Sequence, residues 1–243
     1  MPPETTVIVS DAHLSGEPGD PLAETFHRFL KEVPAMGRHL VINGDLFDFW
    51  FEYRSVIPRT VFPTLAALAE VVRAGVRVTI TGGNHDRWGG RFWKEQLGAA
   101  FYPREVEIDV SGRRALVSHG DGDIEPEFMS KLVHRVIGNP ATSFVFRAIH
   151  PDVGFWMVRK LSGLLGRRRD DDGGKGTAAD AQVEYARELL ELRKDLELVV
   201  LGHTHRAVVV EVAPGRWYVN PGAWMDRYEY ALVTEDGPEL RRF

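Results

Sequence analysis

The sequence predicts an α/β fold with two packed β-sheets and helices on the outside. Short runs rich in Val, Ile and Leu recur along the chain, and each run ends in a cluster of polar residues. Helical patterns lie between the early runs, which is the strand, helix, strand order of an α/β sheet. The C-terminal segment differs, because its apolar runs are joined by Pro-Gly and Asp-Gly turns typical of antiparallel strands. We therefore expect two sheets rather than one open sheet.

Five segments are predicted to be buried strands because of their length, their β-branched residues and the glycines near their ends. They are residues 5–13, 38–45, 76–86, 113–121 and 196–205. Residues 60–74 are predicted to form a helix with a proline in its first turn. The apolar face of this helix consists of Val61, Leu65, Leu68 and Val72, and the proline is Pro63.

Residues 124–170 are predicted to form a helical insert within a single domain that spans residues 1–243. The insert is rich in aromatic and basic side chains. The segment "DDDGGKGTAAD" (170–180) is predicted to be a mobile loop, and a helix is expected at roughly 178–193. In the tail, turns are expected at Pro214-Gly215 and Asp236-Gly237.

The composition argues against several classes of protein. The chain has 243 residues, 44% of them hydrophobic, so it can bury a sizeable core. It contains no cysteine, which excludes disulfides, thiolate metal sites and a cysteine nucleophile. The net charge of −5 argues against a nucleic-acid partner. The absence of cysteine also favours a cytoplasmic location. We find no signal peptide and no run of about 18 apolar residues, so no membrane-spanning helix is expected.

Polar side chains follow each predicted strand, at the point where the strand ends. Residues two apart in an extended chain point to the same side, so Asp11 should face the same way as His13. Ligands of α/β sheets bind beyond the carboxyl ends of strands, which would bring these groups into one crevice. The candidate site residues are Asp11, His13, Asp45, Asn84, His85, His119, His203 and His205. The histidines expected to be structural are His27, His39, His134 and His150.

Carboxylates and imidazoles with one amide and no sulfur suit divalent ions of intermediate hardness, such as Mn²⁺, Fe²⁺ or Zn²⁺. The eight groups are more than one ion with an open position requires. They suffice for two ions that share a carboxylate. In that arrangement His203 and His205 would bind different ions of the pair.

In the order and spacing of these motifs, the chain resembles the calcineurin-like metallophosphoesterases. The family pattern appears as "DAH" (11–13), "GD" (44–45), "GNHD" (83–86), "SHGD" (118–121) and "GHTH" (202–205). The resemblance implies a four-layer α-β-β-α sandwich with an inserted helical lid. It also implies a hydrolase that cleaves phosphoester or pyrophosphate bonds with two metal ions, of which manganese is expected and iron or zinc are alternatives.

The resemblance implies a role for each residue as well. One ion would be held by Asp11, His13, Asp45 and His205. The other would be held by Asp45, Asn84, His119 and His203, so that Asp45 bridges the pair. His85 would face the substrate and stabilise its charge or protonate the leaving group, with Asp86 as the partner of its ring. Two ions roughly 3.5–4 Å apart would clamp the phosphoryl group and activate the attacking water.

Within the superfamily, the layout is most similar to the UDP-2,3-diacylglucosamine pyrophosphatases of lipid A synthesis. The similarity rests on "IVSDAHLS" (8–15), "NGDLFDFW" (43–50), "SHGDGD" (118–123), "GHTHRA" (202–207) and "YVNPGAW" (218–224). It implies that the insert is a lid around acyl chains, with phosphate-binding bases among Arg147, Arg159 and Lys160. Aromatic residues at helical spacing are also typical of a packed core, so a purely structural insert is the alternative.

Two features depart from that subgroup. Its best-known members carry Arg where His85 stands, and the Ser/Asn/Lys pattern that holds the sugar phosphate is not evident in "KLSGLLGRRRDDD" (160–172). The expected substrate is therefore a lipid-linked or nucleotide-sugar phosphoester, and a small soluble phosphoester is the alternative. A noncatalytic scaffold is the third interpretation, and the complete set of ligands argues against it. Contact with a membrane would be peripheral, at its inner face and through the insert.

Overall fold

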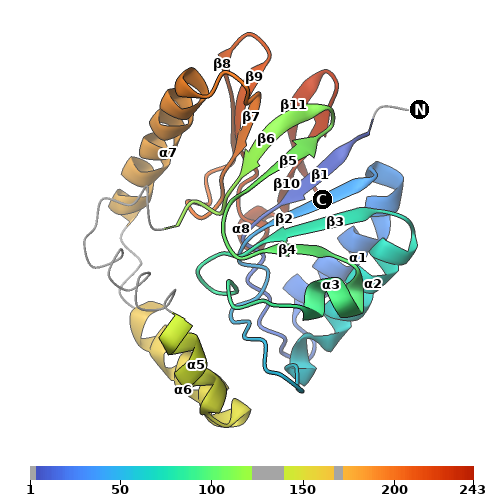
Figure 1. Ribbon diagram of the computed structural model, residues 1–243, viewed down its shortest axis with the longest axis vertical. Coiled ribbons are helices and arrows are strands. Elements are labelled where there is room, and N and C mark those ends of the chain that lie inside the picture. Colours follow the sequence, from blue (N-terminus) through green and yellow to red (C-terminus); the bar gives the residue numbers. More distant parts are fainter. Residues whose placement is uncertain (1–3, 122–139, 167–171) are drawn as a thin grey trace.

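Two β-sheets packed face to face form the centre of the molecule (Figure 1). The computed structural model describes residues 4–121, 140–166 and 172–243. In spatial order, the six-stranded sheet contains β11 (Gly237–Arg242), β10 (Glu229–Thr234), β1 (Thr6–Val9), β2 (His39–Asn43), β3 (Arg77–Thr81) and β4 (Ala100–Tyr102). The five-stranded sheet contains β5 (Val106–Val110), β6 (Arg113–Val117), β7 (Leu198–Val200), β9 (Arg216–Asn220) and β8 (Val208–Ala213). Each of the five predicted strand segments contains one of these strands.

Parallel pairing places the carboxyl ends of the central strands at a common edge within each sheet. Strands β1 to β4 are mutually parallel, and so are β6, β7 and β9. The two C-terminal hairpins, β8–β9 and β10–β11, are antiparallel as predicted. In the second hairpin Thr234 pairs with Gly237, so the turn is formed by the two residues between them.

Alternation of side chains along the strands produces the layers. On β1, Val7 and Val9 join the core beneath the helices of the six-stranded sheet, whereas Ile8 lies in the core between the sheets. On β7, Leu198 and Val200 lie in the same inter-sheet core, and Val199 faces outward beneath a helix. Buried residues with this period on both sheets require covering helices on both outer faces, which gives the predicted α-β-β-α order.

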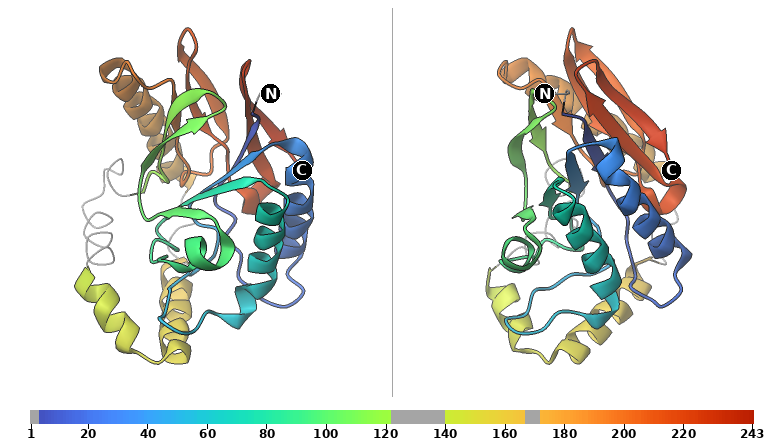
Figure 2. Two further views of the ribbon diagram at one scale, coloured as in Figure 1. Left: turned by 45° about the vertical axis from the view of Figure 1, so that its right-hand side comes forward. Right: turned by 90° about the vertical axis from the view of Figure 1, so that its right-hand side faces the viewer.

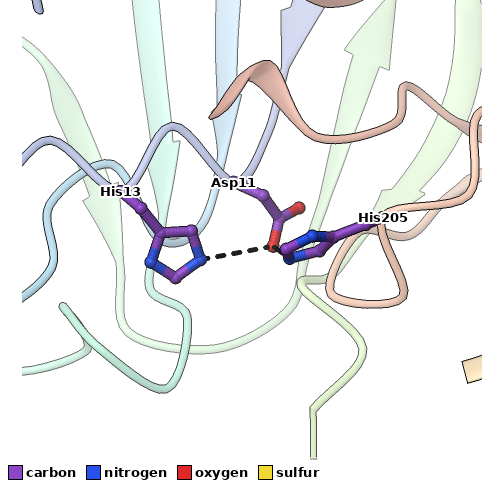
Figure 3. Close-up of side chains that lie close together, drawn as sticks. All are labelled: Asp11, His13 and His205. Carbon is purple, nitrogen blue, oxygen red and sulfur yellow. Dashed lines mark ion pairs between the residues drawn. The ribbon is translucent and has the colours of Figure 1, made fainter. Parts of the chain in front are cut away.

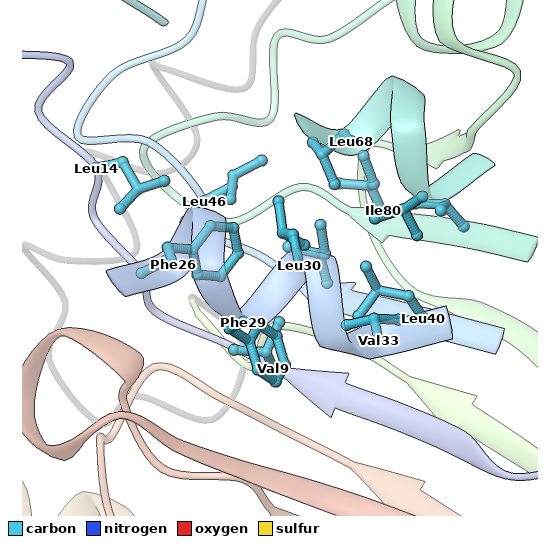
Figure 4. Close-up of a cluster of buried hydrophobic side chains, with 14 of the residues drawn as sticks. Val9, Leu14, Phe26, Phe29, Leu30, Val33, Leu40, Leu46, Leu68 and Ile80 are labelled. Carbon is cyan, nitrogen blue, oxygen red and sulfur yellow. The ribbon is translucent and has the colours of Figure 1, made fainter. Parts of the chain in front are cut away.

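Helices α1 (Pro21–Met36) and α2 (Phe62–Arg73) cover the outer face of the six-stranded sheet (Figure 4). Helix α1 begins where the Asp20 carboxylate accepts a hydrogen bond of 2.9 Å from the Leu22 amide. A 3₁₀ turn, η1 (Arg59–Val61), precedes α2, and Pro63 lies in the first turn of α2 as predicted. Leu65 and Leu68 are buried on the predicted face of α2, where Val71 is buried more fully than Val72.

Helix α7 (Asp172–Leu192) covers the outer face of the five-stranded sheet, and it begins earlier than predicted. The segment 172–180, predicted to be a loop, is the beginning of this helix. Glycine and aspartate have low helix propensity. Extending an existing helix costs far less free energy than starting one, so the helix extends from the packed part of α7 into residues 172–180. The buried face of the packed part includes Ala179, Gln182, Ala186 and Leu190.

Helices α5 (Pro140–Ala148) and α6 (Pro151–Gly166) lie between β6 and α7 in the chain, within the predicted insert. Figures 1 and 2 show both helices at one end of the molecule, apart from the sheets. They contact the core through aromatic rings, for example Phe146 against Phe51 at 4.7 Å between centroids. The other parts of the insert, 124–139 and 167–170, lie outside the described residues. Among the described helices, none is long and apolar enough to cross a bilayer.

Candidate functional site

The loops that follow the carboxyl ends of β1, β2, β3, β6 and β7 bring the candidate residues together from both sheets. Figure 3 shows this for Asp11 and His13, from the loop after β1, and for His205, from the loop after β7. Asp11 is fully buried, and the two imidazoles are partly exposed. The site therefore has a buried acidic floor and an accessible rim of histidines.

The backbone of these loops is not extended. The prediction that Asp11 and His13 face the same side because they lie two apart in an extended chain is therefore wrong in its reason. Strand β1 ends at Val9, and the φ angles of Asp11 and His13 are 52° and 46°, in the left-handed region. Asp45, His203 and His205 also have positive φ angles. Such conformations cost free energy for residues other than glycine, so the surrounding contacts must enforce them. One such contact is the hydrogen bond of 2.9 Å from the His13 amide to the Asp45 carbonyl oxygen.

Asp45 lies between imidazoles that come from opposite sheets. Its Oδ2 is 3.5 Å from His13 Nε2 and 3.2 Å from His119 Nε2. Its Oδ1 accepts a hydrogen bond of 2.9 Å from the backbone amide of His85. One carboxylate thus faces groups on both sides of the site, which is the position that a bridging ligand requires.

Among the residues that the structure describes, three groups of side chains each offer ligand atoms that lie within 4.8 Å of one another. The first is Asp11, His13 and His205, and the third is Asp45, His119 and His203. These two groups are subsets of the two ligand sets that the family resemblance implies. The second group, His13, Asp45 and His85, shares His13 with the first group and Asp45 with the third.

Three buried polar atoms at the site make no hydrogen bond within the part of the chain that the structure describes. They are Asp11 Oδ1, Asn84 Oδ1 and His119 Nε2. Buried polar atoms are normally hydrogen-bonded, and these three belong to a carboxylate, an amide carbonyl and an imidazole. Such donor atoms can bind a divalent cation of intermediate hardness, so the residues present fit a metal site.

The second ring nitrogen of several histidines is held by another group. His119 Nδ1 lies 2.9 Å from the Asn43 carbonyl oxygen, and His205 Nδ1 lies 3.1 Å from Asp226 Oδ2. His13 Nδ1 lies 3.6 Å from a carboxylate oxygen of Asp48. In metal sites such partners orient the ring and increase its basicity. Asp48 and Asp226 could not be identified from the motifs alone, although Asp48 lies within "NGDLFDFW" and Asp226 lies two residues after "YVNPGAW".

Burial and charge act against each other at the centre of the site. Burial alone would lower the pKa of His119, but the carboxylates of Asp45 and Asp11 raise it well above the usual range. Burial would raise the pKa of Asp45, but His119, together with His85 and His13, outweighs burial and lowers it well below the usual range. The charged forms therefore support one another, and a divalent cation would take the place of the imidazolium proton.

The structure corrects the partner predicted for the His85 ring. His85 Nδ1 lies 2.7 Å from the Asp48 carbonyl oxygen, not beside Asp86. The Asp86 carboxylate instead accepts hydrogen bonds from the backbone amides of Gly83 (2.8 Å) and Leu46 (2.7 Å). In the turn after β3, Asp86 is buried, whereas the adjacent His85 is partly exposed. Asp86 fixes the Asp45 loop, and burial followed by the charge of Asp45 raises its pKa to about 6.

Close approach of the backbone explains two glycines of the motifs. Gly44 has a φ angle of 79°, and a Cβ there would lie 2.4 Å from His119 Nδ1. A Cβ at Gly83 would lie 2.2 Å from Asp45 Oδ1. Any side chain at these positions would displace a candidate ligand, so the glycines let loops from different strands come together.

The predicted substrate-binding bases lie on α5 and α6. The Arg147 guanidinium is exposed and lies 5.7 Å from the centre of the Phe51 ring, a cation–π distance. Lys160 is exposed, and the side chain of Arg159 lies outside the described residues. Phe51 follows Asp48 in the loop after β2, so Arg147 contacts the same loop that holds His85.

The order of motifs, the layers and the site agree with comparisons to known proteins. The family model described as calcineurin-like phosphoesterase matches residues 5–207. UDP-2,3-diacylglucosamine hydrolase of Porphyromonas gingivalis is 25% identical over 244 residues, which cover 93% of this chain and 92% of that protein. Proteins of the same name from Serratia proteamaculans and Azotobacter vinelandii are 28% and 29% identical, and cover 98% and 86% of this chain and 98% and 84% of their own. The chain therefore belongs to the calcineurin-like phosphoesterase family, and it is a metal-dependent hydrolase of phosphoester bonds.

Proposed function

We propose that this protein hydrolyses the pyrophosphate bond of an acylated nucleotide sugar of the UDP-2,3-diacylglucosamine type, with two divalent cations bound at the site. The observation that carries the proposal is the convergence of two carboxylates and five histidines at one edge of both sheets. The similarity to UDP-2,3-diacylglucosamine hydrolases over most of the chain supports the substrate class.

Two sets of ligands would share Asp45. One set is Asp11, His13, Asp45 and His205, and the other is Asp45, Asn84, His119 and His203. The positions of Asp45 Oδ2 and of the unbonded Asn84 Oδ1 support this division. Mn²⁺ is the preferred ion, with Fe²⁺ or Zn²⁺ as alternatives, because the donors are nitrogen and oxygen without sulfur.

Bound cations would supply Lewis acidity toward the phosphoryl oxygens and lower the pKa of the attacking water. The chain's own residues would hold this arrangement rigid. Asp86 and Asn43 fix the loops that carry Asp45 and His119 through backbone and ring contacts. Because those contacts are already made, little reorganisation is required as charge develops on phosphorus.

His85 would act on the leaving group. A carbonyl oxygen only accepts hydrogen bonds, so the Asp48 carbonyl requires a proton on His85 Nδ1. This leaves Nε2 as the nitrogen that can face a substrate, since His85 is partly exposed at the rim. In the imidazolium form Nε2 would donate to a phosphoryl oxygen or transfer its proton to the leaving oxygen.

Helices α5 and α6 would contact the lipid part of the substrate. Among the described side chains of these helices, the exposed apolar ones are Phe144, Val145, Val153, Trp156 and Met157. Arg147 and Lys160 lie on the same helices and would contact phosphate, together with Arg159. An apolar face flanked by bases also suits peripheral contact with an anionic membrane surface, which cosedimentation with vesicles of anionic phospholipid would test.

A small soluble phosphoester is the second candidate substrate. The observation that favours it is His85, which stands where the best-known members of the pyrophosphatase subgroup carry Arg. A histidine supplies a proton donor without the fixed charge and the forked contacts of a guanidinium, which suits a wider range of phosphoesters.

Mass spectrometry of the products separates the two candidates. The purified chain with Mn²⁺ is expected to release UMP from UDP-2,3-diacylglucosamine, and to cleave bis(p-nitrophenyl) phosphate more slowly. Turnover of the small diester without release of UMP would favour the second candidate. Absence of turnover on both substrates in the presence of bound Mn²⁺ would contradict the proposed function.

A further inference from the structure

Gln182 is a buried polar residue that lies outside all the sequence motifs. It lies on α7 and is 1% exposed, among apolar residues of the same helix face. Its amide reaches the loop that contains His203 and His205. Burial of an amide in this position costs free energy unless its oxygen and nitrogen make hydrogen bonds.

The Gln182 side chain holds the turn between the two histidines from both ends. Its Nε2 donates a hydrogen bond of 3.0 Å to the Gly202 carbonyl oxygen, and its Oε1 accepts one of 2.8 Å from the Thr204 hydroxyl. The Gly202 oxygen also accepts from the Thr204 amide at 2.8 Å, which closes a tight turn. One amide thus contacts the residue before His203 and the residue between the two histidines.

Two further donors converge on the same oxygen of Gln182. The Tyr218 hydroxyl lies 3.1 Å from Oε1, and Asn220 Nδ2 lies 3.3 Å from it. Burial raises the pKa of Tyr218 to about 12, so its hydroxyl keeps its proton at neutral pH. Both residues belong to β9, which means that the amide joins a helix, a strand and the turn.

The orientation of the Gln182 amide follows from groups that can only donate or only accept. The Gly222 backbone amide donates to Asn220 Oδ1 at 3.0 Å, so Asn220 presents its NH₂ group to Gln182. Gln182 must therefore present its oxygen to Asn220, which leaves its NH₂ group facing the Gly202 carbonyl. The network has one consistent arrangement, which makes it rigid.

The same amide lies against the turn that follows His119. Gly120 has a φ angle of 93°, and a Cβ there would lie 2.8 Å from Gln182 Nε2. Gln182 therefore lies between the "SHGD" and "GHTH" turns, which carry three of the candidate ligands. A residue in this place can set the separation of those turns without touching substrate.

We infer that Gln182 is a positioning residue that holds the turns of His119, His203 and His205 in the geometry required for cation binding. Because α7 directly follows the insert in the chain, Gln182 also anchors the C-terminal side of the insert to the site. This inference rests on the proposed function, since it concerns the same pair of cations. Partners that orient metal ligands typically affect metal affinity by about 10–100-fold when they are changed.

Titration calorimetry with Mn²⁺ on the chelator-treated full chain tests the inference. Gln182→Leu removes the acceptor shared by three donors, and a loss of Mn²⁺ affinity of about 10–100-fold is expected. Gln182→Glu keeps the shape and the acceptor for the three donors but loses the donor to the Gly202 carbonyl, so it is expected to recover only part of that affinity. Leu190→Ala is the matched control, because Leu190 is buried eight residues farther along the same helix, in the apolar cluster beneath the five-stranded sheet. It should lower the thermal midpoint and leave Mn²⁺ affinity unchanged.

The outcomes separate this inference from the proposed function. If Gln182→Leu binds Mn²⁺ as tightly as the unchanged chain, Gln182 has no positioning role and the proposed function is unaffected. An equal loss of affinity in Leu190→Ala would also overturn the inference, because affinity would then follow stability alone. If the unchanged chain does not bind Mn²⁺, the proposed function fails first and this inference fails with it.

Discussion

Strand β2 begins at a buried histidine, His39, and is followed by a buried carboxylate, Asp45. The polar atoms around His39 are hydrogen-bonded to one another, whereas those around Asp45 are arranged as ligands. At the amino end, His39 Nε2 lies 2.9 Å from the Thr79 hydroxyl, and Arg77 donates to its Nδ1 at 3.0 Å. At the carboxyl end, Asp45 faces His13 and His119, and the Nε2 of His119 makes no hydrogen bond with any described residue. One end is satisfied internally, whereas the other leaves ligand atoms directed at a common point.

The difference shows that environment, and not residue type, separates a functional histidine from a structural one. Burial, followed by the charge of Arg77, lowers the pKa of His39 to about 3, which keeps the ring neutral. Carboxylates outweigh the same effect at His119 and raise its pKa. The amino end of the strand stabilises the fold, whereas the loops beyond the carboxyl end have strained backbones and buried ligand atoms without hydrogen bonds to the described residues.

Asp45→Ala should have the largest effect on activity, because both proposed cations would lose a ligand. We expect phosphodiester turnover to fall by about 10³-fold or more, since bound metal ions contribute several kcal/mol to transition-state stabilisation. Asp45→Asn preserves the shape near the His85 amide and should show a similar loss. Metal content by mass spectrometry and turnover are measured together, with the exposed Asp236→Ala as control. Wild-type metal content in both Asp45 variants would contradict the bridging role.

His85→Ala should lower turnover by about 10²–10⁴-fold and leave metal content intact, as expected for a general acid. The reason is geometric, because the Asp48 carbonyl oxygen holds His85 Nδ1 and leaves Nε2 as the nitrogen available to a substrate. His85→Gln restores a donor without a transferable proton and separates charge stabilisation from proton transfer. Loss of metal from either variant would show that His85 is a ligand, as its closeness to His13 and Asp45 permits.

Substitution of the exposed aromatic residues on the insert should lower turnover of the diacylated substrate and leave turnover of a small phosphodiester unchanged. The side chains of Phe144 and Trp156 are 76% and 60% exposed, so replacing either with Ser should not disturb the core. We expect about a tenfold loss of turnover on the diacylated substrate, since each lost apolar contact is worth about 1.5 kcal/mol. Phe62→Ser is the matched control, because Phe62 is 62% exposed on α2. Equal loss on bis(p-nitrophenyl) phosphate would remove the substrate-recognition role of the insert.

The site at the carboxyl ends of the strands can be predicted from the sequence because the signals for it are short, local motifs. β-Branched runs mark each strand, and the glycines and polar residues that follow mark each loop, so the family and the layers follow from short motifs. The eight candidate residues could be found one motif at a time. Their proximity followed from parallel strand order, even though the extended backbone assumed for Asp11 and His13 is wrong.

Contacts between distant segments could not be predicted in the same way. Gln182 meets the "GHTH" turn 20 residues later in the chain, and Asp226 meets His205 across 21 residues. No periodicity or spacing connects such pairs, because they depend on how α7 and α8 (Trp224–Arg227) pack on the sheets. The partner of His85 was misassigned for the same reason, since the Asp48 carbonyl belongs to another loop.

Substitution of His39, at the amino end of β2, should change the free energy of unfolding and the pH dependence of that free energy, but not turnover. In the folded chain the pKa of His39 is about 3, and the ordinary value of 6.5 applies on unfolding. The unfolded chain therefore binds more protons between these values, so the stabilising contribution is complete above pH 6.5 and is lost as the pH falls toward 3. Between pH 7.5 and pH 5 the expected loss is about 2 kcal/mol in the free energy of unfolding.

Urea unfolding at several pH values measures this contribution when the unchanged chain is compared with His39→Gln. The amide cannot titrate, so the variant should lose less stability than the unchanged chain between pH 7.5 and pH 5, while the site histidines contribute equally to both. Turnover of the variant at neutral pH should match that of the unchanged chain, because His39 lies at the opposite end of β2 from Asp45. Identical pH slopes would mean that His39 is protonated in the folded chain, and the contrast between the two ends of the strand would then disappear.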